Sequence, residues 1–460
     1  MKKIIPILAL ALACTALQAQ GLTEEILQDI SCGYAGSPSD KAIRNALNTT
    51  AINVLATNAD APVLDRHFTY EVKTKGRTDQ ASSGRCWLFT GLNVLRAEAI
   101  EKYDLGEFTF SQNYIFFYDQ LEKANLFLQG VIDTAPLPFD DRKVDWLFSN
   151  PIGDGGQFTG VANLIMKYGL VPSEVMPETF CSNNTSQMRS LIARKLREDG
   201  LQLRAAYEGA KNRKKAGPAL QELKKDMLGD IYHILAICLG VPPKEFTWTF
   251  PGSQAEASFT PRSFYDKLVG KDLENSYIMV MNDPSREYGK VYEIEYDRHV
   301  YDGQNWLYVN LPMDRIKEMA VASLKDNKAM YFSCDVGKFL NRKTGVADLE
   351  YLDYESLMGV SFGMDKKARV MTHDSGSSHA MTLIAVDFGS GDKPLKWMVE
   401  NSWGASWGFK GNLIMTDDWF DNYMFRLVVE KKYVPGDILD MLSQKPVLLP
   451  SWDPMFLPEE

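Results

Sequence analysis

The sequence predicts an α+β fold in which a helical layer packs against an antiparallel, barrel-like sheet. Apolar residues recur at helical spacing through much of the first half of the chain. Short alternating or apolar runs bounded by Gly, Asp and Asn fill the second half. Helices first and strands afterwards is an order typical of α+β proteins, and we find no internal repeat.

Several segments of the first half predict helices. Residues 24–55 mix apolar and charged side chains without strong breakers, which predicts one or two short helices. In residues 86–103, apolar side chains recur at spacings of four, three and four. The same spacing predicts helices over 111–128 and over 159–168, the latter ending at Gly169.

Residues 185–230 have a different composition, rich in Leu, Ala, Arg, Lys and Glu, with Gly200 and Pro218 as predicted breaks. We expect two or three helical segments here, within an insertion at about 183–275. The segment holds 11 Lys+Arg against 6 Asp+Glu. Such an excess is typical of a solvated helical face. A polyanion-binding patch is the alternative, but it lacks the interleaved aromatic residues of such surfaces.

The second half predicts strands of four to seven residues. They are expected over 277–280, 291–296, 306–311, 329–334, 381–386, 396–400, 411–416 and 425–429.

Composition narrows the class of protein. The chain has 460 residues, of which 45% are hydrophobic and 24% charged, as in soluble globular proteins. The 23 Phe, 20 Tyr and 9 Trp supply ample core material and exclude disorder as the main state. A net charge of −10 disfavours nucleic acid as a partner.

The N-terminus predicts a secretory signal peptide over residues 1–19. Lys2 and Lys3 precede an apolar run, and Ala19 offers a small residue at the cleavage point. The run is too short for a membrane span, so we expect a periplasmic or secreted protein comprising residues 20–460. The alternative is a lipoprotein anchored at Cys14, although Ala11 stands where that motif prefers Leu.

The cysteine content points to a reactive thiol. Six cysteines are too few for a disulfide scaffold. Loss of Cys14 with the signal would leave an odd number, so at least one thiol stays outside intrachain pairs. The remaining cysteines, whose pairing stays open, are Cys32, Cys86, Cys181, Cys238 and Cys334.

Cys86 is the candidate nucleophile. It opens the helix predicted over 86–103, and the positive end of a helix dipole favours a thiolate, the reactive form of cysteine. Gln80 lies six residues earlier, where its side-chain N–H can stabilise an oxyanion together with the backbone N–H of Cys86. The alternative is a buried, inert cysteine.

His379 is the candidate base because it lies directly before the strand predicted over 381–386, which would hold its ring. His373 lies in a Gly/Ser-rich stretch, a poorer platform. We expect His233 to be a packing residue, and His67 and His299 to be structural.

Asn401 follows the strand predicted over 396–400 and lies 22 residues after His379. Its side-chain carbonyl can accept the imidazole N–H and hold one tautomer. Trp403 can shield that hydrogen bond from water.

In this order, Gln80, Cys86, His379 and Asn401 resemble the active-site residues of papain-like cysteine peptidases. Residues 80–87 resemble the family's nucleophile segment, and Asn-Ser-Trp-Gly at 401–404 its asparagine segment. The resemblance implies that Cys86, His379 and Asn401 are catalytic and that Gln80 lines the oxyanion hole.

The Gly-Asp-Gly-Gly sequence at 153–156 resembles the family's loop that pairs with substrate backbone. The resemblance implies that Gly155 and Gly156 contact the substrate, and we predict that Trp403 also contacts it. Glycines would also let the peptide approach closely.

The long separation of Cys86 from His379 resembles the large branch of bleomycin hydrolase and bacterial aminopeptidase C. Further matching segments are 83–89, 121–125, 167–172, 238–248 and 334–338. The resemblance covers nearly all of the mature chain. It implies a papain-like fold, peptide substrates, aminopeptidase activity without metal or organic cofactor, and a homohexamer with its sites facing an inner chamber.

In this branch the C-terminal tail lies in the cleft, which implies the same for residues 449–460. The Trp-Asp-Pro-Met at 452–455 matches, but Phe456, Leu457 and Pro458 replace the usual small residues. A carboxylate at Glu460 could still pair with a substrate α-amino group. A displaced tail would instead allow endopeptidase activity.

Two further features depart from the branch. Its Met-Thr-His-Ala-Met motif is split here between His373 and His379, and we assign His379 because the strand after it keeps register with Asn401. A signal peptide is also unusual, because the best-known members are cytosolic.

Other classes fit less well. The Gly-x-Ser-x-Gly at 404–408 lacks the later histidine that a serine hydrolase needs. His373 and His379 lack companions for a metal site. A catalytically silent shell would keep the fold and lose the chemistry, yet all four active-site residue types are present.

Overall fold

The computed structural model describes residues 21–34, 36–253, 255–389 and 391–453, which form two compact units. One unit comprises the chain up to Ala59 together with Leu352–Phe362, and the other comprises Asp60–Tyr351 with the chain from Gly363 onward. The predicted signal peptide, Cys14 and Glu460 lie outside the described residues.

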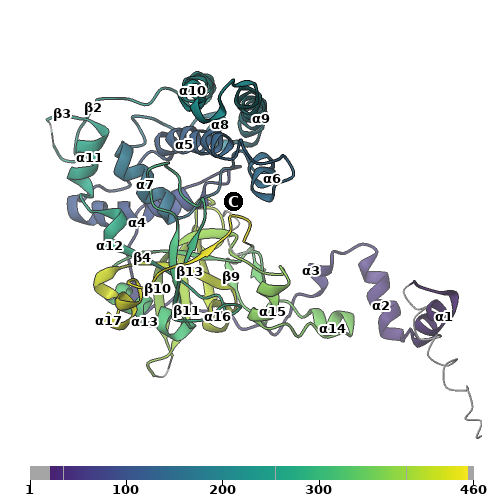
Figure 1. Ribbon diagram of the computed structural model, residues 1–460. Coiled ribbons are helices and arrows are strands. Elements are labelled where there is room, and N and C mark those ends of the chain that lie inside the picture. Colours follow the sequence, from purple (N-terminus) through teal and green to yellow (C-terminus); the bar gives the residue numbers. More distant parts are fainter. Residues whose placement is uncertain (1–20, 35, 254, 390, 454–460) are drawn as a thin grey trace, which may run out of the picture. The chain divides into compact units, whose positions relative to one another are not determined.

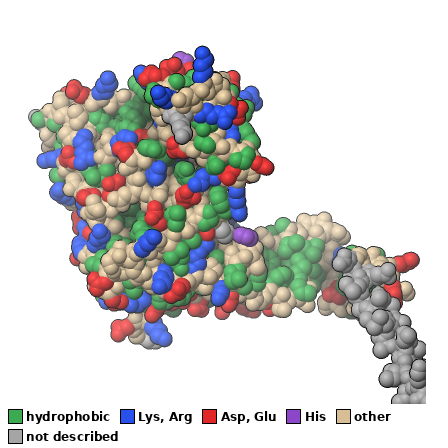
Figure 2. Space-filling view, viewed as in Figure 1, with side chains coloured by type: hydrophobic (Ala, Val, Ile, Leu, Met, Phe, Trp, Pro, Cys, Tyr) green, Lys and Arg blue, Asp and Glu red, His purple; other side chains and the backbone are tan. Residues whose placement is uncertain are grey.

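The smaller unit consists of short helices: α1 (Glu24–Gly33), α2 (Pro38–Leu47), α3 (Ile52–Leu55) and α14 (Tyr354–Met358). A capping box at Ser37 and Asp40 begins α2, and a β-bridge joins Thr57 to Leu352. None of these four helices buries a side chain. Hydrophobic side chains therefore lie on the surface of this unit, over α3 and α14 (Figure 2).

The larger unit has a helical layer on one side of a sheet (Figure 1). The first helices of this layer are α4 (Cys86–Tyr103), α5 (Gln112–Asp133), α6 (Arg142–Ser149), α7 (Phe158–Tyr168) and α8 (Phe180–Asn183). Nearly every side chain of α4 is buried, so this helix is the centre of the first apolar core. The helices predicted over 86–103, 111–128 and 159–168 are confirmed.

The layer continues through residues 186–276. Its elements are α9 (Ser186–Gly209), a 3₁₀ helix (Arg213–Lys215), α10 (Gly217–Leu239), the hairpin β2 (Phe246–Trp248) and β3 (Ala257–Phe259), α11 (Pro261–Leu268) and α12 (Leu273–Ser276). The predicted break at Gly200 is wrong, because α9 runs through it. A Cβ at this position would lie 2.9 Å from the ring of Phe148, so this glycine serves helix packing. Pro218 lies in the first turn of α10, where proline is tolerated.

The sheet contains twelve described strands: β1 (Tyr70–Glu71), β4 (Tyr277–Met281), β5 (Lys290–Ile294), β6 (Leu307–Asn310), β7 (Met330–Cys334), β8 (Leu340–Asn341), β9 (Val346–Ala347), β10 (His379–Phe388), β11 (Pro394–Glu400), β12 (Asn412–Thr416), β13 (Met424–Glu430) and β14 (Val447–Leu449).

The strand order is β14-β5-β6-β4-β13-β7-β10-β11-β12-β9-β8, with β1 on β10. Its centre, from β4 to β12, is antiparallel as predicted. The expectation of a wholly antiparallel sheet is wrong, because β14–β5, β4–β6 and β12–β9 are parallel pairs. The α+β class itself is confirmed.

Further helices of this unit are α13 (Met313–Lys325), α15 (Lys366–Met371), α16 (Asp417–Tyr423), a 3₁₀ helix (Lys431–Tyr433) and α17 (Gly436–Met441). Apolar residues of α13 and α16 join the sheet in a second core, where Trp397 and Phe420 stack with their ring centroids 4.5 Å apart. Within the described part of the chain, no helix is long and apolar enough to cross a membrane.

A buried ion pair joins the two layers. Arg96 of α4 donates to Glu400, the last residue of β11, at 2.5 Å, and both side chains are almost fully buried. Arg96 also donates to the carbonyls of Lys75 at 2.9 Å and Phe108 at 3.2 Å. Arg77 adds a second, longer contact to Glu400 at 3.4 Å. The guanidinium of Arg96 therefore holds β11 against the helical layer.

Replacing Glu400 with Gln should lower the free energy of unfolding by about 3–5 kcal/mol, because Arg96 would remain buried without its counter-charge. Urea unfolding followed by tryptophan fluorescence measures this loss. Arg315→Met is the matched control, since Arg315 pairs with Asp437 at the surface and its loss should cost at most about 1 kcal/mol. Equal losses in the two variants would contradict a central role for the buried pair.

Candidate active site

Cys86 is the first residue of α4 and is completely buried. The backbone N–H of Ala380, on β10, donates to its sulfur at 3.5 Å. This contact brings the helix N-terminus to the start of the strand that carries His379. Arg85, directly before Cys86, is also buried and pairs with Glu178 at 2.8 Å. Cys86 is therefore held to the sheet through Ala380, and Arg85 before it is held through Glu178.

His379 and Asn401 are hydrogen-bonded, with 2.8 Å between the imidazole Nε2 and the amide Oδ1. Because an amide oxygen only accepts, Nε2 carries the proton, and in the neutral ring Nδ1 holds the lone pair. Both side chains are buried. The indole of Trp403 packs against the imidazole with ring centroids 4.8 Å apart. The structure thus places Trp403 beside the histidine, as a cover for this hydrogen bond.

His379 is the first residue of β10 rather than the residue before the strand, and it pairs with Cys334 of β7. Regular structure therefore holds it even more directly than predicted. His373 is exposed, with a φ of 62°, in the loop before β10. His233 is exposed on α10, so its predicted packing role is wrong.

Gln80 lies between the nucleophile and asparagine segments. Its backbone N–H donates to the carbonyl of Ser402 at 2.8 Å, and its side-chain Oε1 accepts from the Ser402 hydroxyl at 2.7 Å. Its Nε2 donates to the carbonyl of Ser83 at 2.7 Å. Ser402 was not predicted as part of the site, although it lies inside the motif at 401–404; the structure joins it to Gln80.

The glycine-rich loop is locked to the nucleophile segment through Asp154. The backbone N–H of Gly84 donates to the Asp154 carboxylate at 3.3 Å, and Thr185 donates to the same oxygen. The indole N–H of Trp87 donates to the Asp154 carbonyl at 2.7 Å. Asp154 and Thr185 were not predicted; an aspartate between glycines is the signal that could have found Asp154.

A cavity of about 750 Å³ lies between this loop and the residues before His379. Gly155 and Gly156 line one wall, and Ser377 and Ser378 line another. Its apolar wall consists of Leu126, Phe127, Trp146, Leu147 and Ile152. The cavity can hold an extended peptide whose side chains pack on apolar groups.

None of the five described cysteines is among the residues that line this cavity, and none forms a disulfide. Cys181 and Cys238 lie close together. Burial, with a smaller contribution from Cys181, raises the pKa of Cys238 to about 11.

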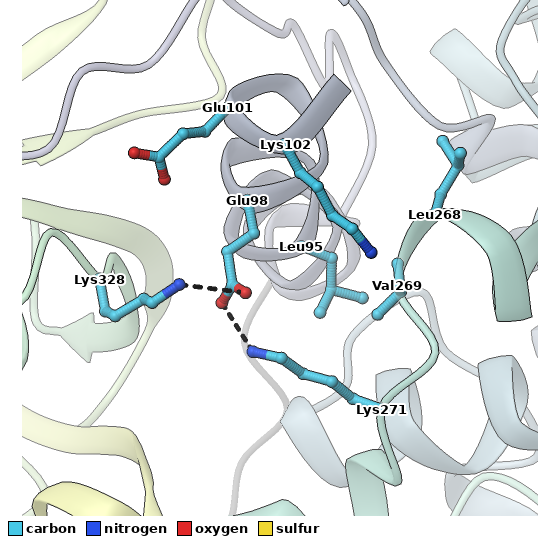
Figure 3. Close-up of a pocket in the computed structure, with 8 residues that line it drawn as sticks. All are labelled: Leu95, Glu98, Glu101, Lys102, Leu268, Val269, Lys271 and Lys328. Atoms are coloured by element: carbon cyan, nitrogen blue, oxygen red, sulfur yellow. Dashed lines mark hydrogen bonds and ion pairs between the residues drawn. The ribbon is translucent and has the colours of Figure 1, made fainter. Parts of the chain in front are cut away.

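A second pocket, of about 330 Å³, lies at the far end of α4 (Figure 3). Glu98 points into it between Lys271 and Lys328, at 2.8 and 3.3 Å. Its lining contains no thiol, hydroxyl or imidazole to act as nucleophile or base. This pocket is an ion-pair network, and the candidate nucleophile Cys86 lies at the other end of the helix.

Comparison with known proteins identifies the family. Residues 21–456 match the Peptidase C1-like family. The chain belongs to this family. It is 40% identical over 403 residues to bleomycin hydrolase of Homo sapiens, covering 84% of this chain and 88% of that protein. It is 39% identical over 437 residues to aminopeptidase G of Lactobacillus delbrueckii subsp. lactis, covering 94% and 98%.

The crystal structure of PepW from Lactobacillus rhamnosis HN001 shares the fold, with a TM-score of 0.88 and 34% identity. The match covers 95% of this chain and 99% of that one. Together with the family match, it confirms the papain-like fold.

The loop leading to His379 is anchored by α15 and by hydroxyl groups. Ser375 donates to Asp335 at 2.8 Å and Ser377 to Ser333 at 2.9 Å. In α15, the buried ammonium of Lys366 donates to Asn282 at 2.7 Å and to two backbone carbonyls. Burial lowers the pKa of Lys366 to about 7, although Asp421 opposes the shift.

This shift gives the stability of the protein a defined pH dependence. Below about pH 7 Lys366 is protonated in both the folded and unfolded states, and the cost of burying its charge is fully present. Above this value the folded protein has lost a proton that the unfolded chain keeps up to about pH 10. The contribution of Lys366 to the free energy of unfolding should therefore rise by about 1.4 kcal/mol per pH unit.

The free energy of unfolding of Lys366→Met, minus that of the wild type, should fall between about pH 7 and pH 9. Urea unfolding at several pH values measures the difference. Lys432→Met is the control, because the half-exposed Lys432 stays protonated throughout this range. A difference that does not change with pH for Lys366→Met would contradict the lowered pKa.

Proposed function

We propose that the protein is a thiol-dependent aminopeptidase that removes N-terminal residues from peptides. One observation carries the proposal: the sulfur of Cys86 lies at the start of β10, beside the hydrogen-bonded pair of His379 and Asn401. Membership of the Peptidase C1-like family supports it, as do relatives that carry the name aminopeptidase.

In the proposed mechanism, the Cys86 thiol gives its proton to Nδ1 of His379, and the thiolate attacks the scissile carbonyl. The backbone N–H of Cys86 and the amide of Gln80 stabilise the oxyanion. His379 then gives the proton to the leaving amine, and an acyl-enzyme remains. A water molecule, deprotonated by His379, attacks the thioester and releases the carboxylic acid and the thiol.

Asn401 acts by holding the His379 tautomer in this scheme, and Trp403 acts by excluding water from their hydrogen bond. Gly155 and Gly156 bind the substrate backbone. The chemistry uses the protein's own side chains and needs no metal or organic cofactor.

We further propose that the C-terminal tail restricts cleavage to peptides with a free N-terminus, because the Glu460 carboxylate pairs with the substrate α-amino group. The end of the described chain supports this. Ser451 donates to the carbonyl of Glu295 at 2.7 Å, and the ring of Trp452 packs against the Arg142 guanidinium at 4.4 Å. Tyr296, which follows Glu295, lines the cavity. Ser451 and Trp452 therefore lie near the wall of the cavity. Endopeptidase activity with a displaced tail is the competing proposal.

Export is a separate proposal that rests on the apolar, lysine-preceded N-terminus. We propose a periplasmic or secreted protein, with lipid anchoring at Cys14 as the alternative.

A pair of fluorogenic peptides tests the aminopeptidase proposal, one with a free α-amino group and one N-acetylated. Under reducing conditions the wild type should cleave only the free amine. Cys86→Ala should lose activity by on the order of 10⁴-fold or more, because the nucleophile is gone.

Equal cleavage of both peptides would show that the tail does not select N-termini and would favour the endopeptidase. Failure to cleave either peptide, with a correctly folded protein, would favour a silent shell or binding protein.

We also propose a homohexamer, as the resemblance to the branch implies. The apolar side chains exposed on the smaller unit support contacts between copies. Leu27, Ile30, Tyr34, Val360 and Phe362 are each more than half exposed. Leaving so many apolar groups in water would be unfavourable in an isolated chain.

Introducing charge into this surface with the double variant Ile30→Glu, Val360→Glu should lower the molar mass in solution from that of six copies to that of fewer copies. Light scattering coupled to size-exclusion chromatography measures the mass. Ile237→Glu is the control, because Ile237 is also more than half exposed but lies on α10. A double variant that remains hexameric would contradict this surface as the contact.

A further inference from the structure

Asp119, Lys123 and His299 lie against the glycine-rich loop and take no part in the mechanism above. Asp119 and His299 are buried and Lys123 is partly buried, and Lys123 and His299 also line the cavity. Asp119 and Lys123 lie one turn apart on α5, and His299 comes from the segment between β5 and β6. The Asp119 carboxylate accepts from the Lys123 ammonium at 2.8 Å and lies 2.6 Å from Nδ1 of His299. Asp119 is completely buried and connects the two residues that line the cavity.

The charges of the network balance. Burial by itself raises the pKa of Asp119, but Lys123 and His299 outweigh it, so the net shift is downward and the carboxylate is ionised. Burial and the nearby Lys123 lower the pKa of His299. The imidazole is therefore neutral and donates its Nδ1 proton to Asp119. One positive and one negative charge remain, each satisfied by hydrogen bonds.

Lys123 reaches the loop directly. Its ammonium donates to the carbonyl of Gly153 at 3.0 Å and to the carbonyl of Gly155 at 2.7 Å, in addition to Asp119. Gln120 donates to the same Gly153 carbonyl at 3.0 Å. All three protons of the ammonium therefore have partners, and two of these are loop backbone.

Holding a carbonyl also orients the amide that follows it. In a planar trans peptide, the C=O of one residue and the N–H of the next point in opposite directions. By holding the Gly155 carbonyl, Lys123 sets the direction of the Gly156 N–H. The Gly156 N–H belongs to a residue that lines the cavity. A backbone N–H of this kind can donate to a carbonyl of an extended peptide bound there.

The His299 ring constrains the same loop peptide bond, between Gly155 and Gly156, by packing beside Gly156. Its ring packs against Trp87 with centroids 4.7 Å apart. A Cβ on Gly156 would lie 2.4 Å from the His299 ring and 2.7 Å from Trp87. The glycine at 156 is thus required by this packing, beyond any need for a close approach of substrate.

We propose that Asp119, Lys123 and His299 are positioning residues that orient Gly155 and Gly156 for the substrate backbone. This inference rests on the proposed peptidase function. The network contacts the loop through the Lys123 ammonium and through the His299 ring beside Gly156. Because backbone contacts are made in both the bound substrate and the transition state, their loss should raise KM and leave kcat nearly unchanged.

The test uses the full-length enzyme and a peptide with a free N-terminus. Lys123→Met should raise KM by about tenfold or more, with kcat within about threefold of the wild type. Lys123→Gln keeps one donor and should raise KM by less. The rate of Cys86 alkylation by iodoacetamide, a small reagent that needs no backbone contacts, should be unchanged in both variants.

Lys271→Met is the matched control. Lys271 is also partly buried and joins two carboxylates, Glu98 and Glu430, but it lies in the pocket at the other end of α4 (Figure 3). Its replacement should lower stability without changing KM. Unchanged KM in both Lys123 variants, or an equal rise in Lys271→Met, would overturn the proposal.

Other outcomes separate this inference from the proposed function. A fall in kcat with slower alkylation would place the effect of Lys123 at the nucleophile and overturn a positioning role. If the wild type cleaves no peptide, the proposed function fails, and binding of the same peptide to Cys86→Ala by calorimetry replaces KM. In the Cys86→Ala background, Lys123→Met should raise the Kd of the peptide by a similar factor, and an unchanged Kd would overturn the inference. If Lys123→Met does not fold, the same measurements on Lys123→Gln are the test.

Discussion

The ion pair of Arg96 and Glu400 lies at the junction on which the site depends. Neither layer contains a complete site: α4 supplies Cys86, while β10 and the residue after β11 supply His379 and Asn401. Glu400 directly precedes Asn401, so the pair that holds β11 to α4 also places the asparagine. A buried charge is tolerated only with its partner, which leaves the two layers little freedom to separate.

From this junction, hydrogen bonds connect the groups that share the chemistry. Asn401 holds the imidazole, Ser402 holds both ends of Gln80, and Gln80 holds the carbonyl of Ser83, three residues before Cys86. Asn401, the proposed orienting group, and Gln80, the proposed oxyanion donor, are therefore joined through Ser402. A displacement of either segment would therefore move both residues.

Local patterns predicted the elements whose periodicity is strong. Helix α4 and strands β7, β10, β11 and β13 begin and end within a few residues of their predicted limits, because a helix or strand repeats its own buried face along the chain. Elements that depend on distant partners were missed. The hairpin of β2 and β3 and the short strands β1, β8, β9 and β14 have weak patterns of their own. Gly200 was misjudged because its packing partner, Phe148, lies 52 residues away.

The sequence by itself determined the candidate residues for the proposed chemistry: a cysteine at a helix start, a histidine at a strand start, and an asparagine after a strand, in that order. Only the tertiary structure decided that they meet, because Cys86 and His379 are separated by 293 positions, and no local periodicity encodes such a contact. The same holds for Ser402, Asp154 and the network behind the glycine loop. Their contacts form only when burial of two apolar cores brings the helical layer onto the sheet.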